Sequence, residues 1–453
     1  MSLSSATIAS SENRMIFGLG TTGRSVARWW RQHGVAFHAV DTRAALAAES
    51  TSWPEMDNVP MAFGEPSVDM ADDVTELIVS PGISLEHPMV VRARDRGCRI
   101  RGDIDLFMEA VAAPVIGITG SNGKSTVTAL LGSMLAECGA KVSVGGNFGR
   151  PALDLLEDSA DCYVLELSSF QLERAEPLGL SVATVLNLSA DHLDRYASMA
   201  VYHQSKHRIF RGVNHVVANR DDPLTVPLLP EEMPVTWWRS GEPDLGEYGL
   251  RELEGVPWLC RGFEPLLSTA ELSLAGTHNY HNVLAALALG VAMGFSEAQL
   301  LAGAARYRGL PHRCERVGVV GDITFIDDSK GTNVGATLAA LKGLGGESNL
   351  WLILGGQGKR QDFSQLRPAV AEYCAGVVVI GEAAAEIVSA LGDVVPVQEA
   401  VSLESAVSQA LALATPGQTV LLSPACASFD MFRDYIDRGE RFKSAVLALG
   451  AAA

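Results

Sequence analysis

One segment near residue 120 constrains the fold more than any other part of the sequence. An apolar run over 115–119 leads into T-G-S-N-G-K-S-T at 119–126, and apolar residues at helical spacing follow. A strand, a glycine-rich turn and a helix in this order form a cradle in which backbone N–H groups and the helix N-terminus bind nucleotide phosphates. Lys124 would neutralise the distal phosphates, and Ser125 would offer a hydroxyl to Mg²⁺. The first glycine of G-x-x-x-x-G-K-[ST] is replaced by Ile118, so the sequence predicts a variant phosphate loop.

Composition narrows the class of protein. The 453 residues suggest roughly three domains, and 47% hydrophobic residues are enough for sizeable cores. A net charge of −18 argues against nucleic acid and anionic membranes as general partners. The seven cysteines form no C-x-x-C pair, and the first residues lack the features of a signal peptide, so a cytoplasmic location is expected. The longest apolar stretch, 283–293, is too short to span a bilayer and predicts a packed helix.

Strand and helix patterns divide the chain into three α/β blocks. We expect a Rossmann-like N-terminal domain over 1–103, a P-loop ATPase-like central domain over 104–309 and a second Rossmann-like domain over 310–453.

The first block contains a second glycine loop. A strand beginning at Met15 leads into G-L-G-T-T-G at 18–23, and a strand over 35–40 ends at Asp41. This pattern usually indicates NAD, with the acid on the ribose. Asp41 is followed by Thr42 and Arg43, however, and an arginine can stack on a base or contact phosphate. A uridine nucleotide is therefore as plausible as NAD.

Titratable residues follow two predicted strands of the central block. Glu166 ends an apolar run that begins at Cys162, where a P-loop enzyme needs an acid to orient its metal. Asp191 and His192 follow a predicted strand over 182–188. Each could equally be an ordinary strand-end or turn residue, and only their convergence at one sheet edge favours a metal site.

The third block places polar residues after three predicted strands. These are D-D-S-K-G-T-N at 327–333, G-G-Q-G-K at 355–359 and S-P-A-C-A-S-F-D at 423–430. Each alone would more often be a helix cap, but three in one domain suggest a second substrate site. Arg313, just after the presumed hinge, could swing onto the phosphates or could simply be a surface residue.

Several of these motifs together resemble the Mur ligases, the ATP-dependent amide ligases of peptidoglycan precursor synthesis. The resemblance covers essentially the whole chain in order. The matching motifs are T-G-S-N-G-K-S-T (119–126), G-G-N-F-G (145–149), E-L-S-S-F-Q-L (166–172), D-H-L-D-R-Y (191–196), H-N-Y-H-N (278–282), L-P-H-R (310–313), D-S-K-G-T-N (328–333) and S-P-A-C-A-S-F-D (423–430).

The resemblance implies a reaction and its substrates. Within the family, G-L-G-x-T-G, D-T-R and S-P-G-I most resemble the members that join D-glutamate to UDP-N-acetylmuramoyl-L-alanine through an acyl phosphate. It implies ATP and two Mg²⁺ sites as cofactors, a monomeric enzyme, and no nucleic-acid partner or membrane insertion.

The resemblance also implies roles for individual residues. Lys124, His192 and Lys206 would be catalytic. ATP would be held by Gly120, Ser121, Asn122, Gly123, Lys124, Ser125, Thr126, Asn279, Asn282, Arg313 and Asp328. The UDP substrate would be held by Thr21, Thr22, Asp41, Thr42, Arg43, Ser80, Gly82, Asn147, Ser168 and Gln171. D-glutamate would be held by Thr332, Lys359, Ser428 and Phe429, and metal by Ser125, Glu166, His192 and Lys206.

Lys206 would act as a carbamate, although the sequence alone predicts a surface helix lysine. Phe429 and Tyr435 depart from the residues common in the family, where leucine and phenylalanine stand. Both positions lie near the implied amino-acid pocket.

Three other functions compete. Folylpolyglutamate synthase shares the T-G-x-x-G-K pattern, but the first block with Asp41-Thr42-Arg43 argues against it. An NAD-dependent oxidoreductase explains the first glycine loop and leaves the second unexplained. A P-loop regulatory module without catalysis gives no account of the groups expected to hold metal and the second-substrate domain.

Overall fold

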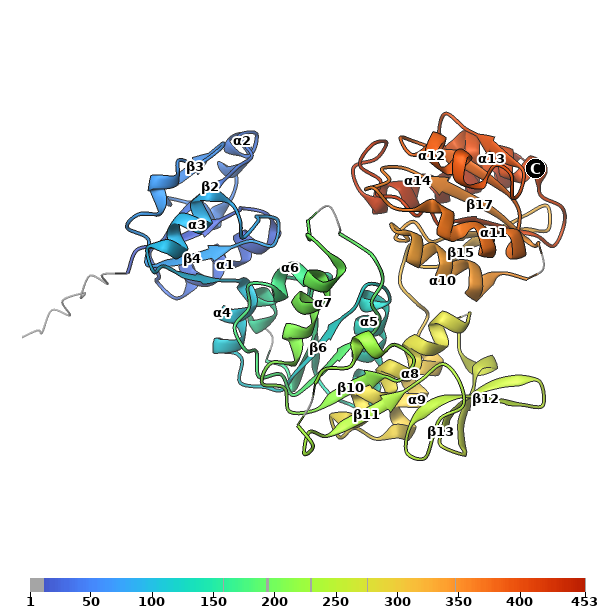
Figure 1. Ribbon diagram of the computed structural model, residues 1–453, viewed down its shortest axis with the longest axis horizontal. Coiled ribbons are helices and arrows are strands. Elements are labelled where there is room, and N and C mark those ends of the chain that lie inside the picture. Colours follow the sequence, from blue (N-terminus) through green and yellow to red (C-terminus); the bar gives the residue numbers. More distant parts are fainter. Residues whose placement is uncertain are drawn as a thin grey trace, which may run out of the picture.

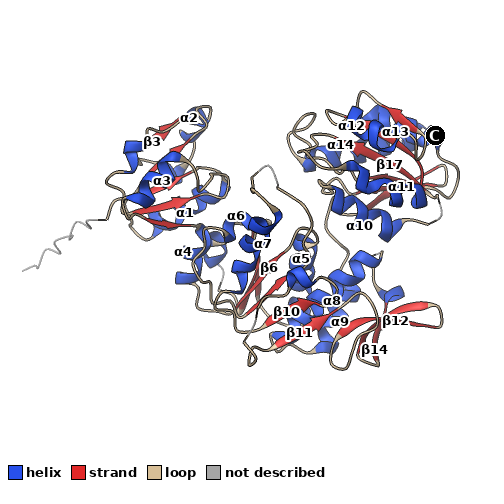
Figure 2. Ribbon diagram, in the orientation of Figure 1, coloured by secondary structure: helices blue, strands red, loops and turns tan. Residues whose placement is uncertain are grey.

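The computed structural model describes residues 12–157, 159–192, 195–228, 230–274, 276–346 and 348–452. Three sheets follow one another along the chain, and the middle unit lies between the first and the last (Figure 1). Helices flank the strands in all three units (Figure 2), which confirms the expected three-domain α/β class. Among the described helices, none combines the length and apolar character needed to cross a membrane.

The N-terminal sheet has the order β3-β2-β1-β4-β5 and is parallel throughout. Its strands are β1 (Arg14–Phe17), β2 (His38–Asp41), β3 (Met61–Phe63), β4 (Glu76–Val79) and β5 (Arg99–Arg101). Its helices are α1 (Thr21–Gln32), α2 (Leu46–Ser50) and α3 (Pro88–Asp95), and α4 (Asp103–Ala110) leads into the central unit and lies beside it (Figure 1). The strand predicted over 35–40 starts later, because Val35 N–H donates to Trp30 O and completes the end of α1.

The central sheet has nine strands in the order β14-β13-β12-β11-β10-β9-β6-β8-β7. It is parallel from β7 to β12, and β12 to β14 form an antiparallel extension. Its strands are β6 (Val115–Thr119), β7 (Val142–Gly146), β8 (Cys162–Glu166), β9 (Val182–Val185), β10 (Val216–Asn219), β11 (Val235–Trp238), β12 (Tyr248–Leu253), β13 (Val256–Arg261) and β14 (Glu264–Ser268). Its helices are α5 (Lys124–Glu137), α6 (Ser169–Leu172), α7 (Met199–His207), α8 (Thr277–Ala292) and α9 (Glu297–Arg306).

The C-terminal sheet has the order β15-β16-β20-β17-β18-β19, with only β15 antiparallel. Its strands are β15 (Glu315–Val320), β16 (Ile323–Asp327), β17 (Leu350–Gly355), β18 (Cys374–Ile380), β19 (Val397–Glu399) and β20 (Thr419–Leu422). Its helices are α10 (Val334–Leu344), α11 (Arg367–Tyr373), α12 (Ala384–Leu391), α13 (Leu403–Leu413) and α14 (Tyr435–Ala452).

The three units are joined in two different ways. One apolar cluster runs from Ile16 and Ile78 in the first sheet to Tyr163 and Leu165 in the second. The C-terminal unit has apolar clusters of its own. It contacts the central unit through α10 against α8 and through polar bonds near the phosphate loop. Apolar burial therefore ties the first unit to the second more firmly than the second to the third.

Candidate active site

The phosphate loop connects the end of β6 to the start of α5. Gly120 and Gly123 have φ of 152° and 81°, which side chains rarely adopt. A Cβ on Gly123 would also lie 2.7 Å from Asn282 Oδ1. Glycine is therefore needed at Gly123 both for its backbone angle and for the close approach of α8.

Residues just after β9 hold the loop in shape, and the sequence analysis missed their role. The strand predicted over 182–188 ends at Val185, because the following residues turn toward the loop. Asn187 Oδ1 accepts from Asn122 N–H at 2.8 Å, and Asn187 O accepts from Ser121 N–H at 2.9 Å. Ser121 Oγ donates to Ser189 O at 2.9 Å. The available signal was a polar N-L-S run directly after a buried parallel strand.

Lys124 lies folded over its own loop. Its Nζ donates to Gly120 O at 2.8 Å and to Ser121 O at 2.9 Å. Burial lowers the pKa of Lys124, although the charges of Glu166 and Asp191 act in the opposite direction. The ammonium is thus held by two carbonyl groups, which an anionic ligand can replace as partners.

Glu166 lies at the end of β8, beside the first turn of α5, and is 2% exposed. Its Oε2 accepts from Ser125 Oγ at 2.5 Å, and its Oε1 accepts from Asn147 Nδ2 at 2.7 Å. Burial acts to raise the pKa of Glu166, but Lys124, Ser125 and Asn147 together hold it below its ordinary value. An ionised carboxylate beside a hydroxyl is a donor set that suits Mg²⁺.

Lys206 is not the surface helix lysine that the sequence alone predicts. It lies on α7 with 2% of its surface exposed, and its Nζ donates to Gly120 O at 2.8 Å. The ammonium also lies 4.8 Å from the ring centre of Tyr202. Burial, followed by the nearby charge of Lys124, lowers the pKa of Lys206 well below its ordinary value. Helical periodicity failed here because the buried residues of α7, Tyr202, Ser205 and Lys206, are polar or amphipathic, and Tyr202 and Lys206 bond to the phosphate loop.

His192 lines the same cavity as Lys124, Glu166 and Lys206, and its backbone has a left-handed φ of 54°. Its Nε2 is 3.6 Å from Asp191 Oδ2, and its ring meets Phe170 edge-on at 4.8 Å between centres. Burial lowers the pKa of His192. A neutral imidazole has a free nitrogen lone pair, which a metal ligand requires.

The C-terminal unit contributes cations to the same place. Arg313 Nη2 donates to Ser125 Oγ at 2.7 Å across the junction between the two units. Lys330, which the sequence analysis did not single out, lies with its ammonium 3.8 Å from the ring centre of Tyr435. Burial lowers the pKa of Lys330 to about 8. The D-S-K-G-T-N motif could have drawn attention to it.

Asp328 and the two asparagines of α8 line the same space. Burial raises the pKa of Asp328 to about 7, and its Oδ2 accepts from Ser423 Oγ at 2.7 Å. Asn282 Nδ2 donates to Asn279 Oδ1 at 3.2 Å. Both asparagines lie in the first turns of α8, after its N-cap Gly276. They line the cavity together with the phosphate loop.

These groups surround one cavity of about 650 Å³ between the central and C-terminal units. The sequence-predicted residues that line it are Ser121, Asn122, Gly123, Lys124, Ser125, Thr126, Asn147, Glu166, Ser168, His192, Lys206, Asn279, Asn282, Arg313, Asp328, Thr332 and Lys359. Gly120 adjoins it through the carbonyl that Lys124 and Lys206 share. Lysine, arginine, acidic and amide side chains thus converge from positions some 200 residues apart, as binding a polyanionic ligand with a metal ion requires.

The first glycine loop forms a separate polar site in the N-terminal unit. Asp41 is buried at the end of β2, where its Oδ2 accepts from Leu19 N–H at 2.6 Å and from Arg43 Nη2 at 2.7 Å. Burial acts to raise the pKa of Asp41, but the bonds from Arg43 and Leu19 hold it below its ordinary value. Ser80 Oγ donates to Gly18 O at 2.6 Å. Thr21, Thr22, Thr42 and Gly82 lie on the same loops, with Gly82 and Thr21 exposed.

Besides Gly120 and the residues of the first glycine loop, three further predicted residues are not among the described residues that line the cavity. Gln171 Nε2 donates to Asp103 Oδ2 at 3.1 Å, between the first two units. Ser428 is buried, whereas Phe429 is 66% exposed. Ala427, just before these two residues, nevertheless pairs with Gln357, two residues before Lys359, so their segment runs beside the Lys359 loop.

Family comparisons cover nearly the whole chain. Residues 12–102 match the Mur ligase MurD-like, N-terminal domain, residues 118–290 the Mur ligase middle domain, and residues 312–426 the Mur ligase, glutamate ligase domain.

Individual relatives give the same result. A UDP-N-acetylmuramoylalanine--D-glutamate ligase of Pseudomonas fluorescens is 48% identical over 437 residues, 96% of this chain and 98% of that protein. The enzyme of the same name from Pseudomonas aeruginosa is 48% identical over 441 residues, 97% and 98% of the two chains. The crystal structure of a MurF ligase of Thermotoga maritima in complex with ADP is 16% identical, with a TM-score of 0.61 over 98% of this chain and 96% of that one. The last likeness concerns the fold alone.

Proposed function

The chain belongs to the Mur ligase family, and from this membership we infer that it is an ATP-dependent ligase that joins D-glutamate to UDP-N-acetylmuramoyl-L-alanine in peptidoglycan precursor synthesis. The observation that carries the specificity is 48% identity over nearly the full length to D-glutamate ligases. The cavity supports the same chemistry independently, because it joins a phosphate loop to a cationic C-terminal wall.

Each unit takes one substrate in this proposal. Residues 1–103 bind the UDP end, 104–309 bind ATP and 310–453 bind the amino acid. ATP is held by the phosphate loop over 120–126 together with Asn279, Asn282, Arg313 and Asp328. The support is that the loop presents helix N-terminal N–H groups, and Arg313 reaches Ser125 from the opposite unit.

Mur ligases use Mg²⁺, and the residues beside the phosphate loop fit that ion. Glu166 and Ser125 supply hard oxygen ligands, and neutral His192 supplies a nitrogen. Bound there, Mg²⁺ would offset the negative charge of the phosphoryl group during transfer. A second ion would need a further oxygen ligand, and a carbamate on Lys206 would supply one. The lowered pKa of this buried lysine favours the uncharged amine that carbamate formation requires.

The remaining residues are assigned to the two other substrates. The UDP end is assigned to Thr21, Thr22, Asp41, Thr42, Arg43, Ser80 and Gly82, and its diphosphate and acyl end to Asn147, Ser168 and Gln171. D-glutamate is assigned to Thr332, Lys359, Ser428 and Phe429. The support is that Ala427, just before Ser428 and Phe429, pairs with Gln357 in the loop that carries Lys359.

The chemistry explains why three units are needed. A carboxylate is a poor acyl donor, so the acyl end of the UDP substrate takes a phosphoryl group from ATP and becomes an acyl phosphate. Lys124 and Arg313 stabilise the negative charge of that group during transfer. The amine of glutamate then attacks the acyl carbon, and phosphate leaves. Water would hydrolyse the acyl phosphate, so the C-terminal unit is expected to close over the cavity first.

Location and assembly complete the proposal. We expect a monomer acting in the cytoplasm, and all seven cysteines are free thiols, as a reducing compartment requires.

One assay tests the proposed function. Phosphate release is measured with ATP, Mg²⁺ and UDP-N-acetylmuramoyl-L-alanine, adding D-glutamate, L-glutamate, L-lysine or no amino acid. D-glutamate should give the fastest release. A faster reaction with either other amino acid contradicts the specificity, and release that needs no amino acid contradicts the ligase assignment.

A further inference from the structure

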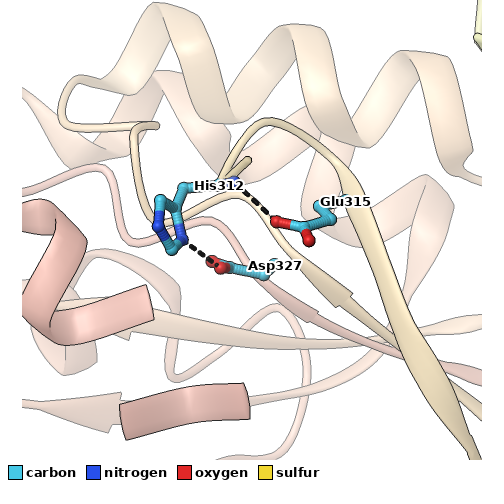
Figure 3. A group of neighbouring side chains, drawn as sticks. All are labelled: His312, Glu315 and Asp327. Atoms are coloured by element: carbon cyan, nitrogen blue, oxygen red, sulfur yellow. Dashed lines mark hydrogen bonds and ion pairs between the residues drawn. The ribbon is translucent and has the colours of Figure 1, made fainter. Parts of the chain in front are cut away.

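His312 is anchored in the C-terminal unit although it directly follows the connection from the central unit. Its Nδ1 lies 2.7 Å from Asp327 Oδ2, and its backbone N–H donates to Glu315 Oε2 at 2.8 Å (Figure 3). Its carbonyl accepts from Lys330 N–H at 3.2 Å. Because an ionised carboxylate only accepts hydrogen bonds, Nδ1 is the ring nitrogen that carries the proton.

The space around the imidazole is closed on the side of α14. A Cβ added to Gly439 would lie 2.2 Å from His312 Nδ1, so only glycine allows this packing. Asp327 is fixed in turn, since its Oδ1 accepts from Ser329 N–H at 2.8 Å. The ring of His312 therefore has one position relative to the C-terminal sheet.

The three side chains in Figure 3 are close enough to hold one metal ion, but their bonds favour another role. Lys443 Nζ already lies 2.9 Å from Glu315 Oε2, and a bound cation would be repelled by it. Asp327 already accepts hydrogen bonds at both oxygens. The group is a closed hydrogen-bonded anchor.

Arg313, the residue after His312, extends away from the C-terminal unit toward the central unit. Arg313 Nη2 donates to Ser125 Oγ at 2.7 Å, in the phosphate loop of the central unit. The residues on either side of Arg313, His312 and Cys314, have left-handed φ values of 62° and 47°. Such angles are unfavourable for side chains and persist only where surrounding contacts enforce them. Both neighbours of Arg313 bond within the C-terminal unit, His312 to Asp327 and Cys314 N–H to Asp328 Oδ1 at 3.3 Å.

We propose that His312 is a positioning residue: its bond to Asp327 fixes the backbone from which Arg313 reaches the phosphate loop. Arg313 then approaches the nucleotide only when the C-terminal unit is in place, which couples the orientation of that unit to phosphate binding. The proposal rests on the inferred role of Arg313 at the nucleotide.

A double-mutant cycle tests the coupling. We expect His312→Ala to lower kcat/KM for ATP by about tenfold and Arg313→Ala by about a hundredfold, since loss of one preorganised donor typically costs 10²–10³. If His312 acts through Arg313, the double variant should lie within about threefold of Arg313→Ala alone. A loss equal to the product of the two single losses overturns the proposal, because His312 would then act independently.

Two conservative variants keep the test valid if His312→Ala does not fold. His312→Asn places an N–H near the position of Nδ1 and tolerates a left-handed φ, so it should retain most of the activity. His312→Gln reaches the position of Nε2 instead and should resemble the alanine variant. The reverse ranking contradicts the proposal.

A control and a second readout separate this result from the proposed function. Glu440→Gln alters an exposed group 3.4 Å from Nε2 and should leave ATP kinetics unchanged. Affinity for a fluorescent ATP analogue needs neither of the other substrates, so its weakening in His312→Ala can be measured even if the amino-acid specificity is wrong. Unchanged nucleotide affinity in both single variants overturns the proposal.

Discussion

Two glycine loops of this chain have the same local design and different surroundings. Each follows a buried parallel strand and opens a helix, α1 in one case and α5 in the other. Beside the first loop, Asp41 accepts hydrogen bonds from Leu19, just after β1, and from Arg43, just after β2. Beside the second, Glu166 is bound by Ser125 and Asn147, and Arg313 approaches from the C-terminal unit.

The difference shows what local geometry leaves open. The cation of the first loop, Arg43, already forms a pair with Asp41 in its own unit, and the central-unit residues Arg174 and Arg195 donate to the carbonyls of Ser80 and Gly82 nearby. The cations of the second loop converge on a shared cavity, where Lys124 donates to two backbone carbonyls of its own loop. A glycine loop supplies N–H groups, and the neighbouring side chains decide which anion it binds and what happens to that anion.

Among substitutions that remove a cation from one of the two loops, Lys124→Ala should lower activity the most. Lys124→Ala should abolish D-glutamate-dependent ADP release, a loss of at least about a hundredfold in kcat, because the transferring phosphoryl group loses its cation. Lys141→Ala, at an exposed lysine of the same unit, serves as the control. Loss of one such group typically lowers kcat about a hundredfold or more. A Lys124→Ala variant that keeps more than about 5% of wild-type activity would therefore contradict the phosphate-loop assignment.

Lys206 should have the next largest effect. Lys206→Ala should lower kcat by about ten- to a hundredfold, as loss of a group in the ligand shell of a metal commonly does. The activity of the wild-type protein should fall in CO₂-depleted buffer and recover with bicarbonate, whereas the variant should not respond. Mass spectrometry of intact protein under mild conditions gives a direct check. A wild-type protein indifferent to bicarbonate and without added mass contradicts the carbamate.

A smaller and selective effect is expected at the first loop. Arg43→Ala should raise the KM for UDP-N-acetylmuramoyl-L-alanine by about tenfold, as loss of one charge-assisted contact would, and leave the KM for ATP unchanged. Steady-state kinetics with each substrate varied in turn measures both. Equal changes in the two KM values would mean that the two loops are not separate sites.

The smallest effect concerns acid stability. The pKa of Asp41 is lowered in the folded state, so its ionised form stabilises the protein above the ordinary aspartate pKa, and this contribution is lost as pH falls through the lowered value. Asp41→Asn should lower Tm on the order of 2 °C at pH 7 and reduce the fall in Tm below about pH 4. Thermal unfolding from pH 7 to 3 tests this, with Asp57→Asn as the exposed control. Parallel curves of Tm against pH for wild type and Asp41→Asn would show that ionisation of Asp41 does not stabilise the folded protein.

Much of the fold could be predicted because it depends on local pattern. Buried parallel strands are continuous apolar runs, and their turns carry glycines, so β6, β8, β17 and β20 are found close to their predicted positions. Strand ends were less predictable. The segment after Val185 reads as more strand, yet Asn187 turns to bind the phosphate loop. Such a change depends on a partner 65 residues away in sequence.

By itself, the sequence determined that strands, glycine loops and helices alternate in three units, and it predicted that one loop binds phosphates. Residue type and spacing suffice for this, because backbone angles and period-dependent burial are local properties. Only the tertiary structure decided the states and partners of the side chains. Lys206 looks like a surface lysine in sequence and is buried beneath the loop, where its charge is costly. Likewise, Arg313 bonds to Ser125 of the central unit, 188 residues away in sequence, from a position next to His312 in the C-terminal unit. Burial and electrostatics depend on three-dimensional neighbours, which the order of residues along the chain does not reveal.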